Sequence, residues 1–404
     1  MTDFKTILSS GKDASPKRFH PWVFSGAIKK TRQHSDGREV EPTEGDVVTV
    51  YSNKDEYLGT GHYSTNASIA IRILTFEEEN IDQDFWNKRI QNAVNYRKNI
   101  GVLTAETNIY RLVHAEGDLL PGLIIDVYGN TAVIQAHSVG MYRSLDNIKI
   151  ALQAALGDSL QSIFQKSKET LPKDFVQSQN IENGYLLKDA EPTTVALEYG
   201  NSFNISWEDG QKTGFFVDQR ENRHLLAKYS KGKNVLNTFC YSGGFSVYAL
   251  KAGANLVHSV DASGRAMDLT DKNIALNPTN GEHKSFTADT FNFLENNDCS
   301  IYDVVVLDPP AFAKHHNVKH NAVQGYKRLN MTALKQMKPG SILFTFSCSQ
   351  AIDMPLFYGT ILSAAILAGR KVRVMHQLSQ PADHPINIYH QESSYLKGLV
   401  LEVE

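Results

Sequence analysis

The chain has 404 residues, of which 41% are hydrophobic and 21% charged, and its formal net charge is −3. This composition is typical of a globular protein and argues against a disordered or fibrous chain, and the net charge argues against indiscriminate nucleic-acid binding. The length predicts two or three domains. Because no apolar run is long enough to span a bilayer and residues 1–18 lack the apolar segment of a signal peptide, we expect a cytoplasmic protein without membrane contact.

Residues 1–75 are predicted to form a small β-rich module of short alternating strands, with a turn at residues 44–46. Between residues 1 and 38, Lys and Arg outnumber Asp and Glu by five. Such an excess fits RNA contact, for which Lys17 and Arg18 are candidates, and it equally fits a solvated face.

Residues 76–190 are predicted to form an α+β section. Apolar residues at helical spacing indicate a helix over residues 84–99, and a second helix is expected over residues 142–157. Between them, residues 123–138 have the pattern of a β-hairpin that turns at Gly129.

From residue 191 to residue 404, strand and helix patterns alternate, which predicts an α/β domain. Repeated βα units imply a parallel sheet covered by helices on both faces, with ligands bound beyond the carboxyl ends of the strands. The last two strand patterns are separated only by the loop of residues 381–393, so we expect them to form an antiparallel pair.

The first βα loop of this domain reads NTFCYSGGFS, from Asn237 to Ser246. Gly243 and Gly244 permit close approach of a ligand to the backbone at a helix N-terminus, although a purely structural turn has the same pattern. The loop lacks the GxGxxG spacing of dinucleotide-binding proteins, which favours a nucleoside ligand.

Acidic residues follow the next two strands. Asp261 suits the two hydroxyls of a ribose, and Asp289, after Ala288, lies where it would reach an adenine ring. Each of these Asp residues is equally suited to be a helix N-cap.

The fourth and fifth strands end in residues that could carry chemistry. The fourth runs into Asp308, Pro309 and Pro310, where the prolines fix the backbone and Phe312 can stack on a flat base. The fifth ends at Cys348, and parallel neighbouring strands would bring Cys348 close to Asp308. The alternative is that Cys348 has only a structural role, as a small apolar residue buried at the edge of a core.

Together these segments resemble class I S-adenosylmethionine-dependent methyltransferases. The whole chain further resembles the PUA-domain RNA methyltransferases of the large-subunit ribosomal RNA (cytosine-C5) methyltransferase I family. The segments that carry this resemblance are HPWVFSGAI, RLVHAEGDLLPGLIIDVYGN, KTGFFVDQRENR, LNTFCYSGGFSVYA, LDPPAF, FSCS and PADHP.

The resemblance implies a Rossmann-like seven-stranded sheet with an antiparallel last strand, an RNA-binding PUA domain and S-adenosylmethionine as the cofactor. The residues that it places at the cofactor are Phe239, Tyr241, Ser242, Gly243, Gly244, Phe245, Asp261, Ala288, Asp289, Asp308 and Gln219. Those that it places at the RNA are Arg220, Pro309, Pro310, Phe312, Lys17 and Arg18. Asn237 and Tyr241 depart from the general methyltransferase pattern, but the closer family shares such a loop.

Cytosine chemistry bears on the role of Cys348. Carbon 5 of cytosine accepts a methyl group only after a thiolate has added at carbon 6, and an acid near ring nitrogen 3, a role for Asp308, assists that addition. Other RNA cytosine methyltransferases carry a second cysteine after the proline of the fourth-strand loop, where this chain has none. A mechanism with one cysteine is therefore implied, with Cys348 and Asp308 as catalytic residues.

The other two cysteines, Cys240 and Cys299, are interpreted as structural, and the odd number without CxxC spacing indicates neither disulfides nor a zinc site. His315, His316 and His320 lie in a polar stretch typical of a solvated loop, so no metal is expected.

Three alternatives stay open. Methylation of a ring or exocyclic nitrogen in RNA needs no thiol, a non-catalytic RNA-binding or ribosome-assembly factor needs no methyl donor, and an NAD-dependent dehydrogenase would need different glycine spacing. The sequence leaves a homodimer open.

Overall fold

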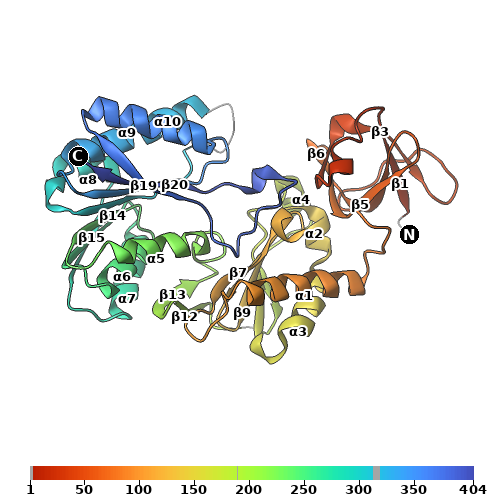
Figure 1. Cartoon of the computed structure of the whole chain (residues 1–404). Coiled ribbons are helices and arrows are strands. Elements are labelled where there is room, and N and C mark those ends of the chain that lie inside the picture. Colours follow the sequence, from red (N-terminus) through yellow and green to blue (C-terminus); the bar gives the residue numbers. More distant parts are fainter. Residues whose placement is uncertain (1–2, 189, 313–318) are drawn as a thin grey trace. The chain divides into compact units, whose positions relative to one another are not determined.

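The computed structural model describes residues 3–188, 190–312 and 319–404, which form two compact units (Figure 1). Unit 1 consists of Met1–Thr194, Ile205–Phe215 and Ala382–Ser393, and unit 2 of Val195–Asn204, Phe216–Pro381 and Ser394–Glu404. Residues 382–393, which lie between the last two strands of the chain, thus belong to unit 1. The predicted domain boundaries near residues 75 and 190 stay a prediction.

The N-terminal part of unit 1 is the β-rich module that the sequence predicts. Its six strands pair in the order β2-β6-β5-β4-β1-β3, antiparallel except for β1 beside β4. Alternate residues such as Val48, Val50, Ile71 and Ile73 point into one core, as expected for strands with one buried face. The strands are β1 (Phe4–Leu8), β2 (Trp22–Phe24), β3 (Ile28–Gln33), β4 (Val47–Tyr51), β5 (Tyr57–Tyr63) and β6 (Ile69–Thr75).

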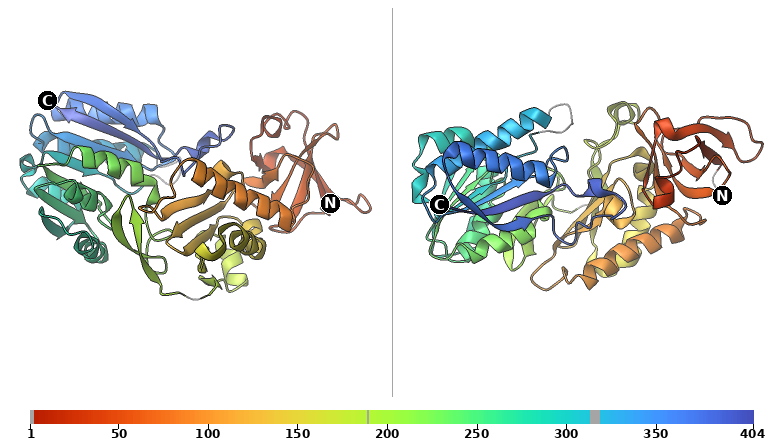
Figure 2. Two further views of the ribbon diagram at one scale, coloured as in Figure 1. Left: turned by 60° about the horizontal axis from the view of Figure 1, so that its bottom comes forward. Right: turned by 45° about the horizontal axis from the view of Figure 1, so that its top comes forward.

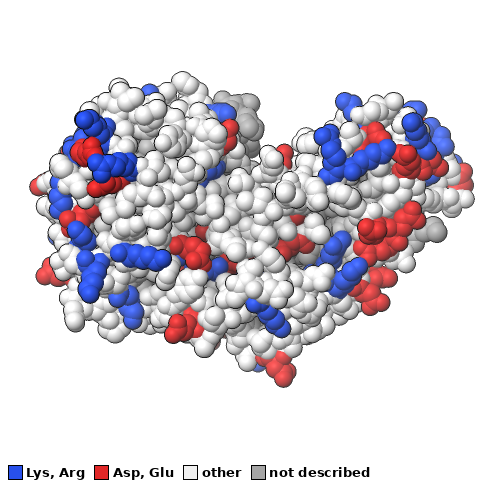
Figure 3. Space-filling model, viewed as in Figure 1, with Lys and Arg blue, Asp and Glu red and all other residues white. Residues whose placement is uncertain are grey.

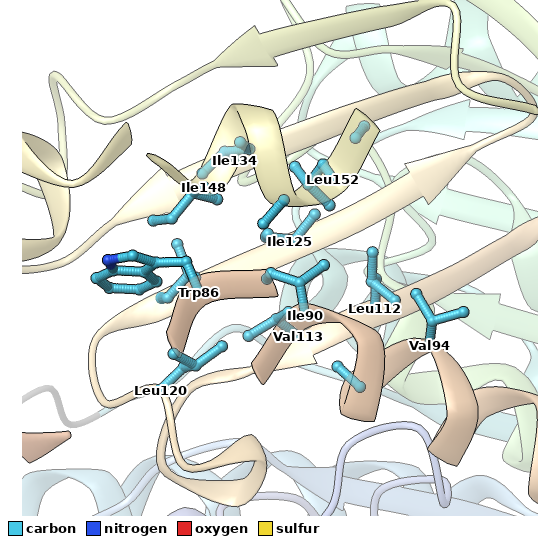
Figure 4. Close-up of a cluster of buried hydrophobic side chains, with 14 of the residues drawn as sticks. Trp86, Ile90, Val94, Leu112, Val113, Leu120, Ile125, Ile134, Ile148 and Leu152 are labelled. Carbon is cyan, nitrogen blue, oxygen red and sulfur yellow. The ribbon is translucent and has the colours of Figure 1, made fainter. Parts of the chain in front are cut away.

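The second part of unit 1 is a five-stranded sheet, in the order β11-β10-β9-β8-β7. Helices α1 and α3 pack on it over a core that includes Trp86, Ile90 and Ile125 (Figure 4). The elements are α1 (Gln83–Asn99), β7 (Ile109–His114), β8 (Leu123–Tyr128), β9 (Thr131–Ala136), α2 (Val139–Arg143), α3 (Leu145–Leu156), β10 (Ser162–Gln165), α4 (Lys173–Ser178) and β11 (Gly184–Leu187).

The predicted elements of this part are found with one change. Asp82 caps α1 by accepting a hydrogen bond from the backbone N–H of Phe85, and β8 and β9 form the expected hairpin. The helix predicted over residues 142–157 is instead two helices that meet at Ser144, whose hydroxyl donates to the carbonyl of Gly140.

Unit 2 contains a seven-stranded sheet in the order β16-β15-β14-β17-β18-β20-β19. Strands β14 to β18 are parallel, and β20 lies antiparallel between β18 and β19. This arrangement confirms the predicted fold class and the antiparallel last strand. The strands are β14 (Asn234–Thr238), β15 (Leu256–Asp261), β16 (Glu282–Thr287), β17 (Val304–Leu307), β18 (Ile342–Ser347), β19 (Val372–Leu378) and β20 (Lys397–Val403); β12 (Thr193–Glu198) and β13 (Asn201–Ser206) form a separate hairpin.

Helices cover both faces of this sheet (Figures 1 and 2). One core joins the sheet to α8, α9 and α10, and a second joins its other face to α5, α6 and α7. The central strands are therefore apolar on both faces, which explains runs such as residues 304–307. The helices are α5 (Arg220–Lys228), α6 (Gly244–Lys251), α7 (Gly264–Ala275), α8 (Thr290–Asn296), α9 (Lys319–Gln336) and α10 (Met354–Ala368).

No helix in the described part of the chain has both the length and the apolar character that crossing a membrane requires.

Replacing Ile90 by Ala is expected to lower the free energy of unfolding of unit 1 by about 2–5 kcal/mol, because a fully buried side chain leaves a cavity. All three tryptophans, Trp22, Trp86 and Trp207, belong to unit 1, so tryptophan fluorescence during urea unfolding reports on this unit. Ile150→Ala is the matched control, since Ile150 is 47% exposed on α3 and should change the same free energy by less than about 0.5 kcal/mol. Equal losses in the two variants would contradict the packing in Figure 4.

Candidate functional site

The candidate site lies at the carboxyl edge of the parallel strands in unit 2. The chain runs from β14 outward to β15 and β16 on one side, and then returns to place β17 and β18 on the other side. The order of the strands reverses between β14 and β17, and open α/β sheets bind ligands beyond such a point. Asp261 ends β15, Asp308 follows β17 and Cys348 follows β18 by one residue, so the predicted residues emerge at this one edge.

The loop between β14 and α6 has an unusual backbone. Phe239 and Tyr241 have positive φ angles of 53° and 46°, which cost energy for residues with side chains. Two hydrogen bonds hold this conformation, from the N–H of Cys240 to the carbonyl of Val260 (3.2 Å) and from the N–H of Tyr241 to Oδ2 of Asp261 (3.0 Å). Strain of this kind is typical of a functional loop.

Gly243 completes the loop with φ +72° at the N-cap of α6. A Cβ atom there would lie 2.6 Å from Cγ2 of Thr270, so only glycine fits. Helix α7 holds the loop from this side, because the Thr270 hydroxyl donates to the carbonyl of Tyr241 (3.0 Å) and the Asn273 amide donates to the carbonyl of Ser242 (2.8 Å). No pattern in the sequence indicated these two contacts from α7.

The two acidic residues after β15 and β16 differ in their surroundings. Asp261 is half-buried, and its carboxylate accepts from the N–H groups of Tyr241 and Ser263, each at 3.0 Å. Asp289 is exposed and caps α8 by accepting from the N–H of Asn292 at 3.0 Å. Asp289 is thus a helix N-cap, which was one of its two predicted roles. Asp261 instead holds the loop between β14 and α6 through its hydrogen bond from Tyr241.

Asp308 is half-buried and faces polar side chains from the start of α5. Its Oδ1 accepts a hydrogen bond from Nε2 of Gln219 (3.0 Å), and Oε1 of Gln219 in turn accepts from the Asn222 amide (2.6 Å). Burial raises the pKa of Asp308 to about 7, the charge of Asp218 acts in the same direction, and the Gln219 hydrogen bond opposes both. A carboxyl group with this pKa can give or accept a proton near neutral pH.

Arg220 and Arg223 of α5 are both buried. Arg223 forms a paired ion contact with Glu198 at 2.7 and 2.8 Å and donates to the carbonyl of Phe216 (3.0 Å). Nε of Arg220 lies 3.3 Å from Oε1 of Glu221. The structure therefore places Gln219 against Asp308, and Arg220 in the adjoining turn.

Cys348 is half-buried after β18. The pKa of its thiol is raised to about 12; burial is the largest cause, the negative charges of Asp308 and Asp218 act in the same direction, and the positive charge of Lys397 opposes them. Strands β17 and β18 are parallel neighbours that pair Leu307 with Thr345, so Asp308 and Cys348 follow adjacent strands at the same edge of the sheet, as predicted. Cys240 and Cys299, by contrast, are 7% and 1% exposed.

Lys397 is a residue that the sequence analysis missed. It pairs with Ser347 across β18 and β20, it is 5% exposed, and its Nζ donates to the carbonyls of Ser349 (2.7 Å) and Tyr395 (2.6 Å). Burial lowers the pKa of Lys397 to about 8, and the neighbouring Cys348 opposes this shift. The strand order could have found it, since an inserted last strand begins beside the end of β18.

Tyr326 and Asp218 were missed as well. Tyr326 is fully buried on α9, where burial raises the pKa of its phenol to about 12 and the charges of Cys348 and Asp308 contribute. Asp218 accepts a hydrogen bond from the Tyr395 hydroxyl at 2.7 Å. No sequence signal pointed to either residue, because their relation to Cys348 arises only from the packing of distant segments.

The loop after β17 begins with Asp308, buried Pro309 and exposed Pro310. The ring of Phe312 packs 4.7 Å from that of Tyr326 and fits against Gly325 of α9. His315 and His316 lie outside the described residues, and His320 is exposed at the start of α9.

Lys17 and Arg18 belong to unit 1. Lys17 forms ion pairs with Asp13 (2.8 Å) and Glu56 (2.5 Å), and Arg18 donates to the carbonyl of Ala14 (3.1 Å). Figure 3 shows Lys and Arg interspersed with Asp and Glu on this module. Acidic residues beyond residue 38, such as Glu56, therefore offset part of the positive excess seen in the sequence.

Comparison with known proteins shows the family to which the chain belongs. Residues 181–386 match the model of the S-adenosylmethionine-dependent methyltransferases, and residues 7–76 match that of the PUA-like domains. The chain is 38% identical to the ribosomal RNA large subunit methyltransferase I of Pseudoalteromonas translucida and 38% identical to that of Aeromonas hydrophila, in each case over 98% of both chains. The chain belongs to this methyltransferase family.

The enzyme is an S-adenosylmethionine-dependent methyltransferase, and solved structures agree with the fold. SMU.776, solved in complex with SAH, superposes with a TM-score of 0.82 over 98% of this chain and 99% of that one, at 23% identity. A Streptococcus mutans protein described as a SAM-dependent methyltransferase gives 0.81, with the same identity and coverage. The edge described above fits the methyl donor, because Asp261 keeps a half-exposed carboxylate and glycines 243 and 244 keep side chains away from the loop backbone.

Gly243→Ala is expected to weaken binding of S-adenosylhomocysteine by about tenfold or more, because the added Cβ must displace either Thr270 or the strained loop. Isothermal titration calorimetry measures the dissociation constant. Gly264→Ala is the matched control: a Cβ atom added at Gly264, in α7, would meet no other part of the molecule within 4 Å and should leave the constant unchanged. Normal binding by the Gly243 variant would remove this loop from the donor site.

The charges around Cys348 predict the pH at which its thiol reacts. Asp308→Asn removes a negative charge that raises the pKa of the thiol, so the pH profile of its alkylation by iodoacetamide should shift to lower pH. Lys397→Met removes a positive charge that lowers this pKa, so the profile should shift to higher pH. At a fixed pH, we expect rates roughly threefold or more above and below the wild-type rate. Mass spectrometry of the peptide that contains Cys348 gives these rates. In the control variant Lys338→Met, which loses only an ion pair with Asp303, the profile should not move.

Proposed function

We propose that this enzyme methylates carbon 5 of a cytosine in large-subunit ribosomal RNA, with Cys348 as the nucleophile. The observation that carries the proposal is that Cys348 and Asp308 follow the neighbouring parallel strands β18 and β17 at the carboxyl edge of the sheet. The relatives named above act on large-subunit ribosomal RNA by their names, and this substrate would place the enzyme in the cytoplasm.

The chemistry assigns one task to each of the two residues. The Cys348 thiolate adds to carbon 6 of the cytosine, and the electrons of the 5,6 double bond make carbon 5 a nucleophile. Bound S-adenosylmethionine supplies an electrophilic methyl group. After methyl transfer, carbon 5 loses its proton to water. As the 5,6 double bond re-forms and Cys348 leaves as a thiolate, nitrogen 3 returns to Asp308 the proton that it received during the addition.

Asp308 manages the proton that this addition requires. With a pKa of about 7, its carboxylate is able to accept the thiol proton and then donate it to nitrogen 3 of the ring. Gln219 holds one oxygen of that carboxylate in place through a 3.0 Å hydrogen bond. With a pKa of about 12, the thiol keeps its proton when no RNA is bound. Proton transfer through Asp308 therefore activates Cys348 only when the target cytosine is present to accept the proton at nitrogen 3.

Lys397 stabilises the thiolate once it forms. Its ammonium group is held by the carbonyls of Ser349 and Tyr395, and no flexible motion is needed to bring the charge near Cys348. Asp308 and Asp218 are negative and raise the pKa of the Cys348 thiol, whereas the positive charge of Lys397 lowers it.

The donor and the RNA would be bound by the residues that the sequence analysis selected. We assign the ribose hydroxyls to Asp261, the adenine to Ala288 and Asp289, and the rest of the donor to the loop from Phe239 to Phe245. Arg220, Pro309, Pro310 and Phe312 would border the target base, which must leave any stack to reach Cys348. In the PUA-like module, Lys17 would contact the RNA after exchanging its acidic partners for phosphates, and Arg18 would contact the RNA beside it.

The proposal is tested in cells that lack this gene and are supplied with variant genes. Cys348→Ala should abolish one 5-methylcytosine of large-subunit ribosomal RNA, with a loss on the order of 10³-fold or more in the rate measured with purified enzyme. Mass spectrometry of the RNA is the readout. Cys299→Ala removes a buried cysteine of unit 2 outside the site and should keep the modification.

Two results would contradict the proposal in different ways. Full methyl transfer by Cys348→Ala would favour methylation of a nitrogen atom, for which no thiol is needed. An unchanged RNA in the absence of the gene would remove ribosomal RNA as the substrate. A covalent complex between the wild-type enzyme and RNA containing 5-fluorocytosine, absent in Cys348→Ala, would support the adduct, because fluorine at carbon 5 blocks release of the thiol.

A further inference from the structure

A group of metal-ligating side chains lies in unit 1. His20 stands between the turn of residues 16–18 and β2, while His390 and Glu392 come from the loop of residues 382–393. One ligand atom from each of the three lies within 4.8 Å of the others, and no other such group occurs among the residues that the structure describes. No motif in the sequence indicated this group, because its members are far apart along the chain.

His390 has an unsatisfied nitrogen that points into the group. The residue is 2% exposed, and its Nε2 has no hydrogen-bond partner, although a buried polar atom without a partner is costly. Its Nδ1 lies 2.8 Å from the hydroxyl of Ser393. With Nδ1–H donating to that hydroxyl, Nε2 carries a lone pair, which is the arrangement of a metal-binding histidine.

His20 has two backbone partners at Nδ1, the carbonyl oxygen of Trp22 at 3.3 Å and the N–H of Trp22 at 3.2 Å. The tautomer with Nδ1–H donating to that carbonyl leaves the lone pair on Nε2, and this is the tautomer that a metal at Nε2 would select. The Trp22 ring packs against the His390 ring with centroids 4.2 Å apart, and its Nε1–H donates to Glu116 (2.8 Å). These contacts hold the His390 ring beside that of His20, whose centroid lies 5.3 Å away.

Glu392 supplies the third ligand from the solvent side. Its Oε2 lies 3.6 Å from Nε2 of His390 and 3.9 Å from Nε2 of His20, and both distances exceed a hydrogen bond. Ligand atoms around a tetrahedral zinc ion are about 3.4 Å apart. The Glu392 side chain is 54% exposed, so it can move the few tenths of an ångström that this geometry requires.

The loop that carries His390 is already fixed to unit 1 by its first residues. Asp383 is fully buried; its carbonyl accepts from Nη2 of Arg97 (2.7 Å), and its carboxylate accepts from the N–H of Arg111 (3.0 Å). A metal at His20 would therefore add a second attachment, between this loop and the N-terminal module.

We propose that His20, His390 and Glu392 bind a divalent transition metal, for which two imidazoles and one carboxylate favour Zn²⁺, with water at the fourth position. The site is separate from the methyl-transfer chemistry. Its expected effect is to stabilise unit 1 by joining residues 382–393 to the β-rich module, because an ion that binds only the folded state favours it.

The test uses the untagged full-length enzyme after treatment with a chelator and desalting. Titration with ZnCl₂ in a calorimeter should show one tight site per chain, and addition of one equivalent should raise the unfolding temperature recorded by tryptophan fluorescence. Glu392→Gln alters an exposed side chain and should weaken binding by about tenfold or more. His390→Phe keeps a ring against Trp22 and should remove the site.

Controls separate this site from other zinc ligands. His34→Gln changes another imidazole of the N-terminal module, one that contacts Thr49, and should leave the stoichiometry and affinity unchanged. Cobalt substitution should give the weak visible bands of nitrogen and oxygen ligands in the wild type. A cobalt–thiolate absorption band, an absence of tight binding, or equal binding by the wild type, Glu392→Gln and His390→Phe would overturn the proposal. Circular dichroism of the metal-free variants checks that they fold.

Discussion

The register of the parallel strands in unit 2 determines where the chemistry of this enzyme can occur. Asn237 on β14 pairs with Ser259 on β15 and with Val306 on β17, and Val306 pairs in turn with Phe344 on β18. Because these strands are parallel and in register, their following residues meet at one edge. Residues separated by more than a hundred positions, from the glycine loop to Cys348, therefore emerge at the same edge. A register shift by one residue in a strand would turn its side chains to the opposite face of the sheet.

The loop between β14 and α6 adds a second constraint, which is imposed by backbone geometry. Positive φ angles at Phe239, Tyr241 and Gly243 bend the chain sharply between β14 and α6, and the bend is maintained by Asp261 from one side and by α7 from the other. The glycine pair predicted such a turn, but it could not predict the strained conformations of the two aromatic residues. Their cost is offset by hydrogen bonds from elements that follow later in the chain, and single-sequence patterns carry no information about those contacts.

The sequence predicted the fold well where a pattern repeats, and it correctly predicted which of the selected residues follow the parallel strands; their roles stay a prediction. Alternating strands and helices indicated the doubly covered sheet, and the missing helix before β20 indicated its antiparallel last strand. The sequence did not predict contacts between residues that are far apart along the chain and meet only in the folded structure. The N-terminal positive charge is partly offset by Glu56, a distant acidic residue, and Lys397 approaches Cys348 only because β20 inserts beside β18. Neither pairing leaves a local signal.

Burial links these features to reactivity. Placing Cys348 and Asp308 in a poorly solvated edge raises the pKa of both groups, so the carboxyl titrates near neutrality while the thiol keeps its proton. The same burial lowers the pKa of Lys397 to about 8. A thiol in this setting resists oxidation and alkylation until a base reaches it, since the thiolate is the reactive form. In the proposed mechanism, Cys348 is therefore unreactive without RNA. It becomes a nucleophile when the target cytosine is bound and accepts the proton that passes through Asp308.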